Sequence, residues 1–186
     1  MNISPREAEQ SLAAIETASQ ESRSRRAYRH AAPYIIGWGI VWAIGYTGSA
    51  ILPHEPANIV WLALIIAMSG FSAVIMRRQS AHKLGWGRIA LYTVVPSVTL
   101  IILVNLIANG FNIRSSIDIY ALFIFIVAAA YAISGLKFGR RYGQLGVGLA
   151  SLTAVGLWLL PSALNIYIFF IDAACLLLAG FWFRRA

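Results

Sequence analysis

The chain has little of what soluble enzymes depend on: of 186 residues, one is cysteine, three are histidine and seven are acidic. A single cysteine, Cys175, excludes an intrachain disulfide and a metal cluster built from cysteines. The histidines lie outside the long apolar runs, so a nucleophile inside those runs has no imidazole base, and one buried acid supplies no carboxylate pair. We therefore expect no enzymatic activity, no cofactor and no metal site.

Apolar residues dominate instead, at 59% of the chain against 12% charged residues, which is typical of membrane proteins. The sequence predicts an all-α membrane protein with six transmembrane helices, each long enough to cross a bilayer. The first apolar run is longer and bulkier than the core of a signal peptide, so we expect it to be retained. The predicted spans are residues 32–52, 58–76, 89–109, 117–136, 144–160 and 164–183.

A short connection with Pro53 and Pro56 joins spans one and two, and a short connection with Pro161 joins spans five and six. Proline is expected in such turns because it ends a helix. The spans are therefore predicted to form three tight hairpins. Residues 1–30 precede this domain, which occupies residues 31–186.

The basic residues fall in alternate gaps between the apolar runs. Because Lys and Arg resist transfer across the bilayer, this pattern predicts an inner-membrane protein with both termini cytoplasmic. The net charge of +8 is spread over loops at the membrane surface, which favours anionic lipid headgroups as partners and no nucleic acid. Fourteen of the fifteen basic residues follow this pattern, and Arg114 is the exception. The fourteen are Arg6, Arg23, Arg25, Arg26, Arg29, Arg77, Arg78, Lys83, Arg88, Lys137, Arg140, Arg141, Arg184 and Arg185.

A separate helix is predicted for residues 1–30. Ser4, Pro5 and Glu7 make a capping box with proline at the first helical position. Its acidic residues come early and its arginines late, which complements the helix dipole. Leu12 and Ile15 lie on a narrow apolar stripe, so this segment is either a solvated extension of the first span or a docking helix for a cytoplasmic protein.

Asp172 is the strongest candidate for chemistry, because it lies near the middle of the sixth span, where an ionised carboxylate is costly. Helical spacing places Asn165, Cys175 and Ala179 on its face, which is expected to point into the bundle. No Lys, Arg or His lies within a span to pair with it. One interpretation is a proton, cation or polar-substrate site; the other is a protonated structural acid bonded to a neighbouring helix.

Hydroxyl-bearing residues on two other spans are candidate partners for Asp172. Ser97 and Thr99 stand beside Pro96 on the third span, where proline frees a backbone carbonyl. Tyr120 and Tyr131 on the fourth span are spaced to line a pocket, although tyrosines in membrane helices more often pack or lie at the interface. The hypothetical substrate or ion site comprises Asp172, Asn165, Thr99, Ser97 and Tyr131.

Small residues four apart mark seams where helices approach closely, within one chain or between copies in a homo-oligomer. Tryptophans near the span ends are expected to anchor at the interface, and Trp42 lies deeper. The seams are Gly45 with Ser49, Ala63 with Ala67, Ser69 with Ala73, and Gly146 with Ala150 and Ala154.

Residues 7–16 (EAEQSLAAIE) and 33–46 (PYIIGWGIVWAIGY) resemble a group of uncharacterised bacterial inner-membrane proteins in which a short cytoplasmic helix precedes several spans. This resemblance implies a bacterial origin and no particular activity. The sequence thus favours a non-enzymatic membrane subunit or sensor that engages a cytoplasmic partner. The alternative is a small transporter in which Asp172 couples a proton or cation to a solute.

Overall fold

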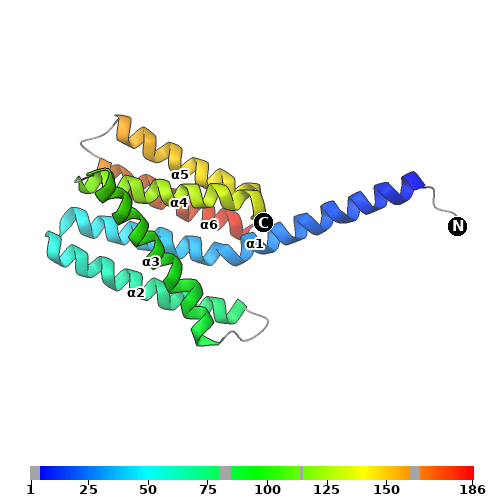
Figure 1. Cartoon of the computed structure of the whole chain (residues 1–186), viewed down its shortest axis with the longest axis horizontal. Coiled ribbons are helices and arrows are strands. Elements are labelled where there is room, and N and C mark those ends of the chain that lie inside the picture. Colours follow the sequence, from blue (N-terminus) through cyan, green and yellow to red (C-terminus); the bar gives the residue numbers. More distant parts are fainter. Residues whose placement is uncertain (1–4, 80–84, 114, 160–163) are drawn as a thin grey trace.

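The computed structural model describes residues 5–79, 85–113, 115–159 and 164–186, which contain helices and no strands (Figure 1). The helices are α1 (Pro5–Ile51), α2 (His54–Gln79), α3 (Trp86–Gly110), α4 (Ser116–Phe138), α5 (Arg140–Leu159) and α6 (Leu164–Arg184). The expected cap at Ser4 and the expected turn at Pro161 lie outside the described residues.

Helix α1 is one continuous helix of 47 residues, so the expected N-terminal helix and the first span are a single element. Its first part projects away from the bundle, and we call residues 5–27 the extension (Figure 1). Pro33 lies within α1. Because proline has no amide proton, the carbonyl of Arg29 loses its helical partner there. The helix continues past Pro33 nonetheless, close to where it enters the bundle.

Within the part of the chain that the structure describes, four helices are long and apolar enough to cross a membrane: Arg6–Ile51, Glu55–Gln79, Asp118–Phe138 and Arg140–Leu159. A shorter apolar helical stretch, Val98–Gly110, lies in α3. Helices α1 and α2 are joined by Leu52 and Pro53 alone, which makes that connection a tight turn.

Most of the buried core comes from α1, α4, α5 and α6, and Met68 joins it from α2. Among the described residues, the most extensive packing joins α1 to α6 and α4 to α5, whereas α3 touches α4 little. The closest pairs are therefore not the partners expected from the hairpins. Among the described side chains, the largest fully buried ones lie on these four helices: Ile35, Ile124, Leu149, Thr153, Asp172, Leu176 and Phe183.

Glycine explains the close approach of α4 and α5. A Cβ atom at Gly146 would run into the backbone of Ala128 and Ala132, so no larger residue fits between the helices. One turn away, a Cβ on Gly135 would lie 2.7 Å from the Cα atom of Gly143. Helices in lipid gain stability from such close contacts, because lipid tails solvate apolar side chains as well as protein does.

The other predicted seams differ in how they are used. Gly45 faces the ring of Trp61, whose indole Nε1 donates a hydrogen bond to the Ser49 hydroxyl at 2.9 Å. Trp61 therefore packs between α1 and α2. Ala63 and Ala67, in contrast, are exposed on α2.

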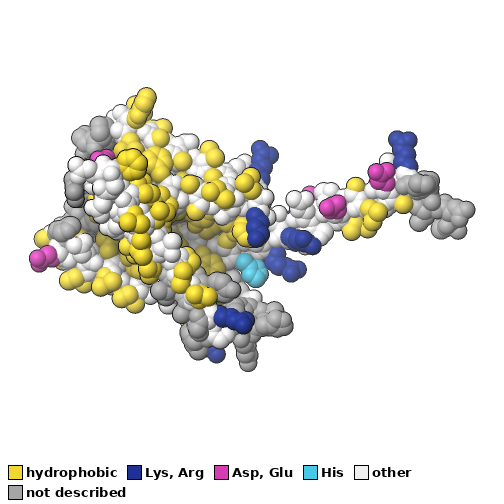
Figure 2. Space-filling model, viewed as in Figure 1, with side chains coloured by type: hydrophobic (Ala, Val, Ile, Leu, Met, Phe, Trp, Pro, Cys, Tyr) yellow, Lys and Arg dark blue, Asp and Glu magenta, His cyan; other side chains and the backbone are white. Residues whose placement is uncertain are grey.

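Basic side chains gather at the end of the bundle from which the extension leaves (Figure 2). The last turn of α2 carries Arg77 and Arg78, the last turn of α4 carries Lys137, and the last turn of α6 carries Arg184. The bundle thus has one strongly basic end, and its opposite end carries Glu55 and Asp118.

Candidate functional site

The base of the extension is held by an aromatic cluster. Tyr28 on α1 is buried, with 7% of its surface exposed. Its ring centroid lies 5.1 Å from that of Phe183 on α6 and 5.7 Å from that of Tyr142 on α5. Tyr28 therefore joins α1 to the two helices whose ends meet there.

The turn between α4 and α5 fits against Tyr28. Gly139 is the single residue that joins the two helices, and its φ of 116° is one that favours glycine. A Cβ atom at Gly139 would also collide with the Tyr28 hydroxyl. The backbone N–H of Arg141 donates to that hydroxyl at 3.3 Å, and the Tyr142 hydroxyl donates to the carbonyl of Ala27 at 3.3 Å.

Arg141 completes this arrangement. Its guanidinium lies 5.3 Å from the ring centroid of Tyr28 and 4.7 Å from that of Trp182, and it donates to the Trp182 carbonyl at 2.7 Å. Cation–π contacts and a charge-assisted hydrogen bond thus tie α1, α5 and α6 together. We call Tyr28, Gly139, Arg141, Tyr142, Trp182 and Phe183 the clamp.

Beyond the clamp, the extension exposes the predicted apolar stripe. Leu12 and Ile15 have 68% and 65% of their surface exposed. They line a cleft of about 1470 Å³ between the extension and the end of α4, where Lys137 and Phe138 form its other wall. This apolar pair is therefore not covered by the bundle.

Asp172 is completely buried on α6. Its Oδ2 atom lies 3.2 Å from the Thr153 hydroxyl oxygen on α5, which is also 2.8 Å from the carbonyl oxygen of Leu149. A hydroxyl has one proton and a carbonyl only accepts, so both contacts are satisfied when Asp172 is protonated and donates to Thr153. Among the described residues, Asp172 Oδ1 has no hydrogen-bond partner.

The other predicted site residues are not all gathered around Asp172. Thr99 is exposed on α3, and the hydroxyl beside Asp172 comes from Thr153 instead. Tyr131 stacks on Tyr142 of the clamp, with ring centroids 6.4 Å apart. The side chains of Ser97 and Asn165 lie outside the described part of the structure.

Two residues near Asp172 were missed by sequence reasoning. Thr153 belongs to a stripe of buried positions on α5 that includes Gly146 and Leu149, and this spacing was its only signal. Tyr46 on α1 is buried and lies within electrostatic range of Asp172. Tyr120 packs edge-on against Tyr46 at 5.8 Å. The groups near Asp172 therefore come from α1 and α5, and Tyr120 of α4 packs against the first of them.

Within the described residues, no group of three His, Cys, Asp or Glu side chains is placed to hold a metal ion. Comparisons with protein-family models, with curated proteins and with solved structures find no match. The geometry of the extension, the clamp and Asp172 thus carries the functional argument.

Proposed function

We propose that this protein is a non-enzymatic membrane subunit or sensor whose extension docks a cytoplasmic protein. The observation that carries the proposal is that α1 runs without a break from the exposed pair Leu12 and Ile15 into the buried core. A partner bound to the extension is thereby connected to the bundle through a single helix. The clamp at Tyr28 supports this role, because it fixes the direction in which the extension leaves.

The proposed setting is the inner membrane of a bacterium, with six spans in three hairpins and both termini in the cytoplasm. The concentration of basic side chains at the clamp end of the bundle supports this orientation, because basic segments stay on the cytoplasmic side (Figure 2). The same residues would meet anionic lipid headgroups. The exposed pair Ala63 and Ala67 on α2 supports a homo-oligomer as a further proposal.

The docking proposal is tested by charge insertion in the full-length chain. The variant Leu12→Glu/Ile15→Glu places two charges on the apolar stripe, whereas Ala14→Glu/Thr17→Glu places two charges elsewhere on the extension with the same spacing. Proteins that co-purify with each chain in lipid nanodiscs are then quantified by mass spectrometry. We expect a protein that is recovered with the unmodified chain and with the control variant but lost with the stripe variant. If no protein is lost selectively, the docking proposal fails.

A second candidate function rests on Asp172. Its complete burial, with one carboxyl oxygen lacking a partner among the described residues, supports a transporter that couples a proton or cation to a solute. In this case Asp172→Asn abolishes potential-driven proton uptake by liposomes that contain the protein, and the stripe variant leaves it unchanged. Under the docking proposal, Asp172→Asn alters stability only and the co-purifying protein is retained.

A further inference from the structure

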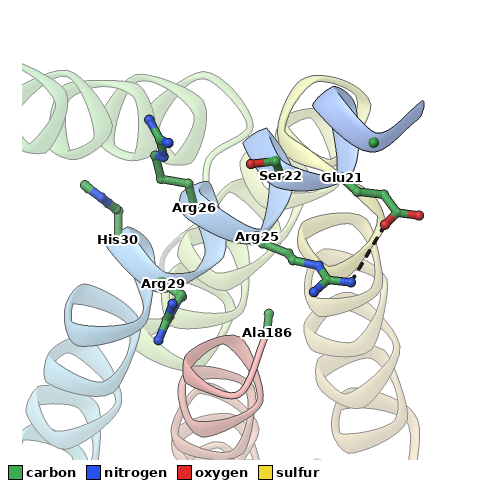
Figure 3. Close-up of a pocket in the computed structure, with 8 residues that line it drawn as sticks. Glu21, Ser22, Arg25, Arg26, Arg29, His30 and Ala186 are labelled. Atoms are coloured by element: carbon green, nitrogen blue, oxygen red, sulfur yellow. Dashed lines mark ion pairs between the residues drawn. The ribbon is translucent and has the colours of Figure 1, made fainter. Parts of the chain in front are cut away.

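A basic hollow lies beside α1 where the extension meets the bundle (Figure 3). It measures about 720 Å³ and lies next to the end of α6. Three arginines and one histidine line it, and its one acidic side chain is that of Glu21. The lining residues are Ala18, Glu21, Ser22, Arg25, Arg26, Arg29, His30 and Ala186.

Most of the positive charge in this hollow is unpaired. Glu21 lies 3.7 Å from Arg25, and about two thirds of each side chain is exposed, so this pair is weak. Arg26 and Arg29 have no acidic group within 4.0 Å among the described residues. The hollow therefore attracts an anion, and Glu21 is the group that such an anion would displace.

Arg25 and Arg29 are spaced to bind one anion together. Residues four apart lie on the same face of a helix. In Figure 3 the side chains of Arg25 and Arg29 flank Ala186, with Arg25 extended toward Glu21, whereas Arg26 and His30 lie on the other side of α1. Guanidinium groups bind phosphate oxygens through two parallel hydrogen bonds, which makes phosphate the anion that matches this pair.

The depth of these arginines in the proposed membrane points to the same ligand. Ala32 is buried and begins the apolar part of α1. At about 1.5 Å per residue, Arg29 stands about 4.5 Å and Arg25 about 10 Å beyond Ala32. The headgroup layer extends about 5–7 Å outside the hydrocarbon region, so the backbone of Arg29 lies within it and that of Arg25 lies just beyond it. Long arginine side chains at these two positions therefore reach the phosphate level.

We propose that Arg25 and Arg29 form a binding site for the phosphate group of an anionic ligand, either a lipid headgroup in the adjacent leaflet or a soluble phosphate ester. This inference rests on the proposed membrane placement of α1 and does not depend on a protein partner at Leu12 and Ile15. A failed docking experiment therefore leaves it standing, and a failed phosphate experiment leaves docking standing.

The test uses the full-length chain in nanodiscs that contain equal amounts of phosphatidylcholine and phosphatidylglycerol. Native mass spectrometry measures how strongly phosphatidylglycerol is enriched among the lipids that stay bound. Because one arginine near a membrane surface contributes about 1 kcal/mol, Arg25→Gln or Arg29→Gln should each lower the enrichment roughly fivefold. Arg23→Gln is the matched control, since Arg23 is on the same helix and does not line the hollow. Glu21→Gln should raise the enrichment, because it removes the competing carboxylate.

A second arm separates the two sources of phosphate. Glycerol 3-phosphate is titrated into nanodiscs of phosphatidylcholine alone, and binding is followed by calorimetry. Saturable binding that is lost in Arg25→Gln identifies a soluble phosphate ester as the ligand; phosphatidylglycerol enrichment without such binding identifies a lipid headgroup. The proposal is overturned if neither is observed, or if Arg23→Gln lowers the signal as much as Arg25→Gln and Arg29→Gln do. The gain expected for Glu21→Gln is a result that a misfolded variant cannot imitate.

Discussion

Helices α4 and α5 pack differently from α2 and α3, although all four are apolar. The α4–α5 pair is closed by glycines whose Cα atoms approach the neighbouring backbone, and it contains fully buried Ile124 and Leu149. On α2 and α3 large apolar side chains face outward, with Leu62 60% and Leu106 66% exposed. In lipid, apolar side chains alone do not drive helices together, so the residues that allow close approach decide which helices form the core.

The division has a functional consequence. We call α1, α4, α5 and α6 the glycine-packed half. The extension belongs to this half, because it is the first part of α1 and its base is clamped to α5 and α6. Helices α2 and α3 attach to this half mainly through α1. A signal that passes between the extension and the membrane domain would therefore travel through the tightly packed helices.

Replacing Gly146 should disrupt the core most severely. In Gly146→Leu the added side chain meets the backbone of Ala128 and Ala132, which cannot move aside without separating α4 from α5. Overpacking against backbone should cost about 3 kcal/mol or more. Gly70→Leu on α2 is the matched control, because a Cβ atom there has nothing within 4 Å. Thermal unfolding in nanodiscs should show a large drop for the first variant and little for the second; equal drops would remove the distinction between the two halves.

Truncation of leucine should have a smaller effect in the same direction. Leu149 is fully buried and Leu106 is 66% exposed. Leu149→Ala leaves a cavity and should cost about 2 kcal/mol, the low end for such changes, because lipid tails reduce the transfer contribution. Leu106→Ala should change the free energy of unfolding by less than about 0.5 kcal/mol. Unfolding by titration with a denaturing detergent compares the two, and a larger loss for Leu106→Ala would mean that α3 belongs to the core.

Removing the charge of Arg141 should loosen the clamp. Arg141→Gln loses two cation–π contacts and weakens the hydrogen bond to the Trp182 carbonyl, at a combined cost of about 1.5 kcal/mol. Hydrogen exchange at residues 24–31 should accelerate as the base of the extension loosens. Arg140→Gln removes the same charge from the exposed neighbouring residue and should leave exchange there unchanged. Unchanged exchange in both variants would show that Arg141 does not hold the extension.

The sequence determined the helical class and the membrane character, because runs of about 20 apolar residues have few other structures available. It also indicated that the Asp172 side of α6 faces inward, and Asp172 and Ala179 are indeed buried. The sequence did not predict whether α1 would be one continuous helix. Pro33 falls close to the predicted start of the first span, where a helix could equally begin or continue.

The contacts between helices were harder to predict, since helical spacing gives the face of each helix but not the helix opposite. Thr99 was predicted to lie near Asp172 and Thr153 was not, but the packing of α5 against α6 brings the hydroxyl of Thr153 to Asp172. Tyr28 had no motif of its own. Its role depends on the turn at Gly139, more than one hundred residues away along the chain.

The contact between Thr153 and Asp172 should contribute less to stability than the contacts of Gly146, Leu149 and Arg141. A double-mutant cycle isolates its contribution. Thr153→Val keeps the shape of the side chain but removes the hydroxyl, and it should cost about 1 kcal/mol. Thr153→Ser keeps the hydroxyl and is the control. After Asp172→Leu, the Thr153→Val change should cost less, because the hydroxyl then bonds only the Leu149 carbonyl. Additive costs would mean that the two side chains do not stabilise each other. The burial of Asp172 would then favour a transport role over a structural one.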